Sequence, residues 1–221
     1  MKFYHKLLQQ TEMSRKYLLS SPVILRTMQS DISIEDYITF LTQAYHHVKH
    51  TVPLLMSVGA KLGDKQEWLR EAVAEYIEEE IGHQEWILND IYFCGGDIQA
   101  VRTGIPAAET ELMIAYAYDM SNRVNPLGFF GMVLVLEGTS VRLATLAADL
   151  IQKKLELPDT AFSYLRSHGS LDQEHIKFFE ALMNKITDLE DQHLIIHAAN
   201  MFYRLYANIF RSLDQCQAAA A

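Results

Sequence analysis

Apolar residues recur every three or four positions along most of the chain, which is the spacing of amphipathic helices. Capping residues and prolines divide this pattern: Ser33 to Asp36 has the spacing of a capping box, and Asn125-Pro126 that of a helix start. No alternation of period two is long enough to predict a strand. The pattern predicts an all-α protein with helices over residues 2–19, 34–51, 53–62, 65–93, 107–122, 126–155, 159–185 and 188–213.

The composition agrees with a bundle of long helices. The chain has 221 residues, of which 49% are hydrophobic, so it can bury a substantial core. Ten glycines and five prolines are few for this length, since these two residues make up about 12% of an average protein. The sequence therefore predicts a single domain over residues 1–221, built as a bundle of seven to eight helices.

Two polar residues lie on the apolar face of the segment 65–93. On a helical wheel of 100° per residue, Glu80 falls within about 10° of the centre of that face and His83 within about 55°. Glu79 lies at its edge, and the other glutamates of the segment point away from it. A Glu-x-x-His pair that faces the core is the spacing with which helix bundles bind a bridged pair of metal ions.

The segment 159–185 shows the same feature with three residues. His168, Asp172 and His175 all lie within about 30° of the centre of its apolar face on the same wheel. Their spacing places three side chains that bind metals on consecutive turns of one inward face.

Glu137 lies in the most apolar part of the chain, the segment 126–155, which is apolar all round and is predicted to be the central helix. A buried carboxylate costs several kcal/mol unless it is paired or bound to a cation. Arg142, the nearest basic residue in the sequence, is five positions away and points elsewhere. Something outside this segment must therefore compensate the charge of Glu137.

Each of these residues has a simpler explanation when it is taken alone. A buried histidine is most often a hydrogen-bonded core residue, and a buried glutamate can belong to an ion pair. Six such groups in one core are better explained by a shared metal centre. Three carboxylates and three imidazoles exceed what one tetrahedral zinc ion uses and suit two iron or manganese ions, which most often activate dioxygen. Hydrolysis by zinc or magnesium stays an alternative.

Other polar residues are candidates for a pocket. His46 and His50 share a helix face, where they could line the pocket, bind a heme or belong to the surface or core. Tyr76 lies on the apolar face of its segment and is assigned to the core or the pocket. Gly82, Gly138 and Gly169 each adjoin a candidate ligand, and glycine within a helix predicts close packing or local distortion.

Charge and cysteine content exclude several classes of protein. A net charge of −9 argues against binding of nucleic acids, which needs a basic surface. No apolar run approaches the ~20 residues of a membrane-spanning helix, and the charged N-terminus does not have the pattern of a secretory signal. Cys94 and Cys216 are too far apart in sequence to suggest a disulfide framework or a zinc site. We therefore expect a cytoplasmic protein that does not bind membranes.

Three stretches of the sequence resemble a known superfamily: AYHHVKHTVPLLM, EYIEEEIGHQEWILNDI and HGSLDQEHIKFF. Over residues 34–213 the chain is similar to heme-oxygenase-like proteins, and within them to the iron-containing diiron oxidases. The resemblance implies a heme-oxygenase-like helical bundle, often a homodimer, that uses two iron ions, or manganese, with O2 as co-substrate. It also implies a ligand set, with Glu79 as an alternative to Glu80 or as a residue that supports the ligands: Glu80, His83, Glu137, His168, Asp172 and His175.

The same resemblance leaves a second function open. The chain could be a non-catalytic or cofactor-free protein that binds heme or a small metabolite, as in the TenA/PqqC-like branch. A heme oxygenase needs a histidine near the N-terminus, for which His5 is available, but Gly128-x-x-Gly131 is a poor match to the glycine-rich distal helix. A thiaminase-like enzyme needs a cysteine in the pocket, and both cysteines lie at helix or chain ends. We expect an O2-dependent non-heme diiron oxidoreductase that acts on a small molecule.

Overall fold

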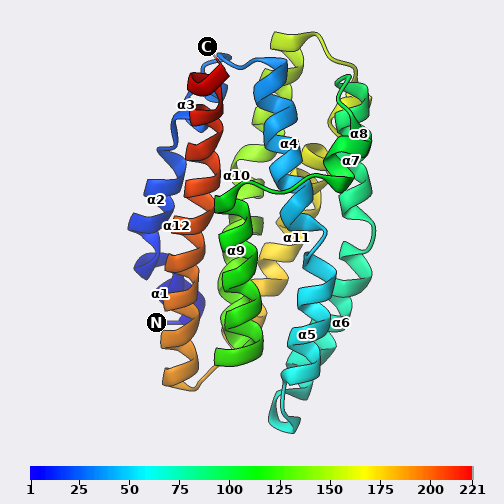
Figure 1. Cartoon of the computed structure of the whole chain (residues 1–221). Coiled ribbons are helices and arrows are strands. Elements are labelled where there is room, and N and C mark those ends of the chain that lie inside the picture. The colour runs from blue at the N-terminus through cyan, green and yellow to red at the C-terminus, as the bar shows by residue number, and fades with distance from the viewer. Residues whose placement is uncertain (221) are drawn as a thin grey trace.

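The computed structural model describes residues 1–220, except for the side chains of residues 169–174 and 214–220. Its helices pack side by side in an elongated bundle (Figure 1), and the described residues contain no strand. This confirms the all-α prediction. The helices are α1 Phe3–Gln10, α2 Glu12–Leu19, α3 Pro22–Met28, α4 Ile34–Val48, α5 Thr51–Lys61, α6 Glu67–Glu80, α7 His83–Phe93, α8 Ile98–Thr103, α9 Ala108–Asp119, α10 Phe129–Leu155, α11 Ser163–Met183 and α12 Leu189–Ala220.

The predicted central helix is α10, which packs against both α11 and α12. Gly131 explains how closely α10 and α12 approach, because a Cβ atom at this position would lie 2.5 Å from the backbone nitrogen of Ala199. Among the described residues, Pro126–Leu155 is the one helical segment long and apolar enough to cross a membrane. Two-thirds of its most apolar window is buried inside the bundle, as expected for a core helix.

Glu137 lies at the junction of two apolar clusters. The first half of α10, from Phe129 to Val135, belongs to a cluster with α5, α6, α9 and α12. Its second half, from Ala144 to Ile151, belongs to a cluster with α4, α7 and the start of α11. The polar groups near the middle of α10 are therefore enclosed by apolar side chains on both sides.

The prediction of one helix over residues 65–93 was wrong, because the structure has two helices there with a break between them. α6 ends at Glu80, and α7 begins at His83. Between them Ile81 is extended and Gly82 has φ +95°, in the left-handed region that glycine adopts without the strain of a Cβ atom. Gly82 thus causes the local distortion that a glycine beside a ligand predicts, whereas Gly138 does not: α10 is continuous there, and an added Cβ would meet open space.

Smaller differences explain why the structure has more helices than the seven or eight predicted. The segment 2–19 is interrupted at Thr11, whose hydroxyl donates back to the carbonyl of Leu7. Two further helices, α3 and α8, are too short for a periodic pattern to reveal them. The predicted capping box at α4 is present, with Ser33 and Asp36 exchanging side-chain and backbone hydrogen bonds.

Candidate metal centre

Glu80, His83 and His168 bring three metal-binding atoms together. One ligand atom from each residue lies within 4.8 Å of the other two, although Glu80 and His168 come from helices far apart in the sequence. Nδ1 of His83 is 3.1 Å from Oε2 of Glu80. Burial opposes ionisation of Glu80, but the hydrogen bond from His83 and the positive charges of His83, His168 and His175 outweigh it and lower the pKa of Glu80.

The break at Gly82 places the first two of these side chains. Because Glu80 is the last residue of α6 and His83 the first of α7, they face each other across the turn rather than along one helix. Trp86, one turn into α7, stacks on the His83 ring with 4.0 Å between ring centroids. The ring of His168 meets His83 edge-on, with centroids 4.9 Å apart. Aromatic packing thus holds both imidazoles in position.

His168 has a defined tautomer in its neutral form. Its Nδ1 lies 3.0 Å from the carbonyl oxygen of Tyr164, one turn earlier in α11. A carbonyl oxygen only accepts hydrogen bonds, so Nδ1 carries the hydrogen and Nε2 keeps its lone pair. A hydrogen bond of this kind is the usual support behind a histidine that binds a metal through its other nitrogen.

His175 is the centre of a second group of ligands. Its Nε2 is 2.9 Å from Oε2 of Glu79, and its Nδ1 is 3.8 Å from Oε1 of Glu137. The ring of Tyr76 packs against the imidazole at 6.1 Å between centroids. Glu79 and Glu80 therefore serve different groups: Glu80 faces His83 and His168, and Glu79 contacts His175.

The structure brings together five of the six predicted ligands, together with Glu79. The sixth, Asp172, lies outside the described side chains. His83 and His175 are buried, and Glu137 is 9% exposed in the middle of the most apolar helix. Carboxylates and imidazoles without sulfur are a donor set that suits iron or manganese. The residues present therefore fit a buried centre for such ions.

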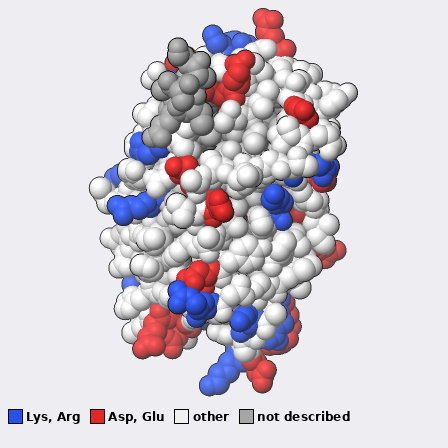
Figure 2. Space-filling view, in the orientation of Figure 1, with Lys and Arg blue, Asp and Glu red and all other residues white. Residues whose placement is uncertain are grey.

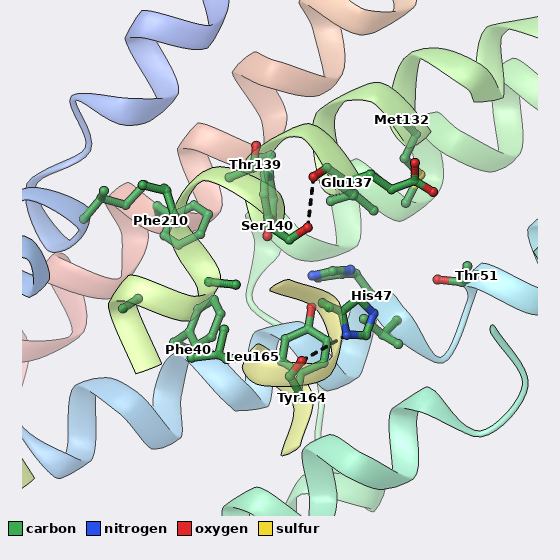
Figure 3. Close-up of a pocket in the computed structure, with 18 of the residues that line it drawn as sticks. Phe40, His47, Thr51, Met132, Glu137, Thr139, Ser140, Tyr164, Leu165 and Phe210 are labelled. Carbon is green, nitrogen blue, oxygen red and sulfur yellow. Dashed lines mark hydrogen bonds between the residues drawn. The ribbon is translucent and has the colours of Figure 1, made fainter. Parts of the chain in front are cut away.

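An apolar pocket adjoins these ligands, with a cavity volume of about 150 Å³. Glu80, Glu137, His168 and Tyr76 line it. Figure 3 shows Glu137, Thr139 and Ser140 of α10 on one side, with Phe40 and His47 of α4 and Leu165 of α11 on the other. None of the described lining residues is lysine or arginine. The carboxylates of Glu80 and Glu137 therefore have no lysine or arginine partner among the described lining residues of the pocket.

The histidine of α4 in this pocket is not one of the two that the sequence predicted. His46 contacts Lys49, His50 contacts Tyr118, and neither lines the pocket. His47 lines it, is 2% exposed and has no hydrogen-bond partner at Nδ1. Burial, followed by the nearby His168, His50 and His46, lowers the pKa of His47 to about 3, so its ring is neutral.

Residues 38–207 match the model of a protein family described as iron-containing redox enzymes. The chain belongs to this family. Because the matched segment contains every candidate ligand, the family description applies to the part of the chain that forms the centre. A comparison with curated proteins finds no match.

Solved structures share the fold of this chain. A domain of unknown function with a heme oxygenase-like fold from Shewanella denitrificans superposes with a TM-score of 0.87 at 22% identity, covering 97% of this chain and 93% of that chain. A TenA homologue from Pseudomonas syringae gives 0.82 at 12% identity, covering 96% and 93%. The heme oxygenase from Leptospira interrogans gives 0.77 at 15% identity, covering 96% and 100%. The heme-oxygenase-like fold predicted by the resemblance is confirmed.

The residues considered for a heme oxygenase or a thiaminase-like enzyme lie away from the pocket among the described residues. His5 is exposed on α1 and does not line the pocket, and Gly131 serves the contact between α10 and α12. Cys94 lies outside the pocket, and burial raises the pKa of its thiol to about 11, opposite to an activated nucleophile. Cys216 lies outside the described side chains.

The face shown in Figure 2 carries charges of both signs, interspersed over a largely uncharged surface. The net charge of the whole chain is −9, which argues against a nucleic-acid partner. That nucleic acids and membranes are not partners stays a prediction.

Proposed function

We propose that this protein is an O2-dependent non-heme diiron oxidoreductase that acts on a small molecule. The observation that carries the proposal is the convergence of buried carboxylates and imidazoles from α6, α7, α10 and α11 beside an apolar pocket. The family description supports iron and redox chemistry. The number of ions and the use of O2 are part of the proposal.

Two groups of side chains would hold the two ions. Glu80, His83 and His168 would bind one, since their ligand atoms lie together. Glu137 and His175 would bind the other, with Glu79 as a further ligand or a partner of His175. Asp172 lies between His168 and His175 in the sequence of α11 and completes the predicted set. Bound iron, or manganese in its place, would supply the redox chemistry with O2.

The chain's own residues would prepare this centre. The Tyr164 carbonyl keeps Nδ1 of His168 protonated and leaves Nε2 for a ligand bond. The lowered pKa of Glu80 keeps its carboxylate ionised at neutral pH. Apolar side chains from both clusters exclude water from the pocket, which protects a reactive centre from side reactions.

Anaerobic titration with Fe(II) tests the proposal directly. We expect roughly two iron ions per chain, as in other bundles with this ligand pattern, and a structure with anomalous scattering should place them at His168 and His175. Glu78→Gln, which changes an exposed glutamate of α6 next to the ligand pair, is the matched control and should bind iron as the wild type does. Failure to bind Fe(II) in the anaerobic titration would exclude the diiron function and favour a metabolite-binding protein.

The resemblance also leads us to propose a homodimer located in the cytoplasm. Light scattering after size-exclusion chromatography would test the first point, and fractionation of cells that produce the protein would test the second. Neither point is needed for the metal centre, because all the ligands described come from one chain.

A further inference from the structure

His47 is buried in the wall of the pocket without a hydrogen-bond partner at Nδ1 among the described residues. It lies near the end of α4 and is 2% exposed. The ring of Tyr206 in α12 meets the imidazole edge-on, with 5.8 Å between the centroids. Burying a polar nitrogen without a partner costs free energy that a leucine at this position would avoid. The fold alone therefore does not account for a histidine here.

Other polar side chains of the lining are turned onto the backbone. The hydroxyl of Thr139 donates to the carbonyl of Val135, and the hydroxyl of Tyr37 donates to that of Ala161. These donors are already paired, so they have no hydrogen to offer to a ligand. His47 differs from them, because it lines the same cavity while its Nδ1 is unused by the described residues.

His47 is not part of the group of ligand atoms at the metal centre. The atoms that lie within 4.8 Å of one another belong to Glu80, His83 and His168. His47 and His168 nevertheless line the same pocket, and they are near enough for the charge of one to lower the pKa of the other. His47 therefore lies beside the centre without belonging to it.

The chemistry of this imidazole selects the kind of group that it can bind. Burial lowers the pKa of His47 to about 3, so at neutral pH the ring is uncharged and offers one N–H donor and one lone pair. No lysine or arginine is among the described lining residues. An uncharged polar group fits this position. A hydroxyl fits it best, because it both donates and accepts and so pairs with either tautomer of the ring.

We propose that His47 binds the substrate by a hydrogen bond to an uncharged hydroxyl group, and that the substrate carries this group near its reacting atom. Apolar side chains such as Phe40, Met132 and Leu165 would surround the rest of the molecule (Figure 3). That the bound molecule is a substrate rests on the proposed function, whereas the hydrogen bond to His47 does not.

Phenol and toluene are matched probes of the metal-free protein, because they have the same number of heavy atoms and differ in one hydroxyl group. A cavity of about 150 Å³ is as large as one that binds benzene in another protein. In calorimetry, His47→Leu should weaken phenol binding roughly tenfold, as the loss of a buried hydrogen bond does. Toluene should bind as before or more tightly. Equal changes in the two affinities, or no binding of phenol to the wild type, would overturn the proposal.

Three further variants show which group holds the hydroxyl. His47→Asn keeps a donor and an acceptor and should retain most of the preference for phenol that His47→Leu loses. His46→Leu makes the same change at the neighbouring buried histidine of α4, which does not line the pocket, and should bind both probes as the wild type does. If phenol affinity falls in Glu137→Gln but not in His47→Leu, the hydroxyl binds the carboxylate and the proposal is wrong.

Nuclear magnetic resonance of protein labelled with ¹⁵N-histidine tests the contact without relying on the leucine variant. The ring nitrogen signals of His47, assigned by their absence in His47→Asn, should shift more with phenol than with toluene, since a hydrogen bond changes the nitrogen directly. If Fe(II) binds but these signals respond equally to both probes, this inference is wrong and the diiron centre is unaffected. If the signals respond as expected but Fe(II) does not bind, the proposed function is wrong and His47 belongs to a metabolite-binding pocket.

Discussion

The carboxylate of Asp90 in α7 accepts the backbone N–H of Tyr164, at the start of α11, over 2.8 Å. Its other oxygen accepts the backbone N–H and the hydroxyl of Ser163. Asp90 thus caps from another helix the first amides of α11, which have no partner within the helix. Since α7 carries His83 and α11 carries His168, this contact joins two of the three helices that supply this group of ligands.

Asp90→Ala should destabilise the protein and weaken metal binding together. Burial raises the pKa of Asp90, and the hydrogen bonds from Ser163 and Tyr164 offset part of that cost. Removing the acceptor leaves buried amides without partners, at about 1–3 kcal/mol for each unsatisfied group. Urea unfolding of the metal-free protein and Fe(II) titration measure the two effects. Unchanged iron affinity in a destabilised variant would show that Asp90 is structural only.

Glu80→Gln should weaken Fe(II) binding more than Glu79→Gln. The Glu80 carboxylate is largely buried between His83 and His168, whereas the side chain of Glu79 is 42% exposed beside His175. A buried charge next to a cation contributes more because water screens it less. Anaerobic titrations of both variants, with Glu78→Gln as the control, measure the order. A larger loss in Glu79→Gln would reverse the assignment of the two glutamates.

Glu137→Gln separates a ligand from a structural carboxylate. The substitution keeps the volume of the side chain and removes a charge that His175 approaches to 3.8 Å. If Glu137 binds a metal ion, iron affinity should fall, while the metal-free protein should change little in its free energy of unfolding or gain stability. If the free energy of unfolding of the metal-free protein falls by about 3–5 kcal/mol and iron binding is unchanged, the substitution has instead broken a buried ion pair.

Iron affinity should fall as the pH is lowered through the histidine range. The pKa of Glu80 is already below its ordinary value of 4.5, so this carboxylate stays ionised there. Protons therefore compete with metal at the imidazoles of His83, His168 and His175, and each ligand histidine can contribute up to about a tenfold loss per pH unit. Metal titrations between about pH 5 and 8 test this. Constant affinity over that range would contradict three histidine ligands.

Much of the fold could be predicted because helices of this length leave a strong period in the sequence. α10 and α12 bury wide apolar faces, and their predicted and observed extents agree closely at their starts. The inward position of Glu80, His83 and His168 was also predictable, since a carboxylate or imidazole on an apolar face stands out on a helical wheel. Their grouping across three helices required the tertiary structure.

The break at Gly82 could not be predicted from periodicity. Apolar residues continue on the same face through Ile81 and Trp86, so a wheel shows one helix. The left-handed conformation of Gly82 ends one helix and starts the next without changing the spacing of apolar residues in the sequence. His47 was missed for a different reason. His47 lies seven residues after Phe40, on the face of α4 that lines the pocket. The sequence indicates its neighbours His46 and His50 as the pocket candidates, because those two share a helix face.

His47 should make the metal-free protein less stable in acid. Its ring stays neutral in the folded state down to about pH 3, whereas in the unfolded chain it titrates near its ordinary pKa of 6.5. Below pH 6.5 the unfolded state therefore binds more protons, and the free energy of unfolding falls as pH falls, by up to about 1.4 kcal/mol per pH unit.

His47→Leu removes this titration, so the variant should lose less stability than the wild type between neutral pH and the acid range. Two pH units below 6.5 the difference should reach about 2–3 kcal/mol in favour of the variant, relative to its difference at neutral pH. Urea unfolding of the metal-free proteins at both pH values measures it, and His5→Leu, at an exposed histidine of α1, serves as the control. If wild type and His47→Leu lose stability in parallel, His47 takes up its proton in the folded protein, and the pocket around it is open to water.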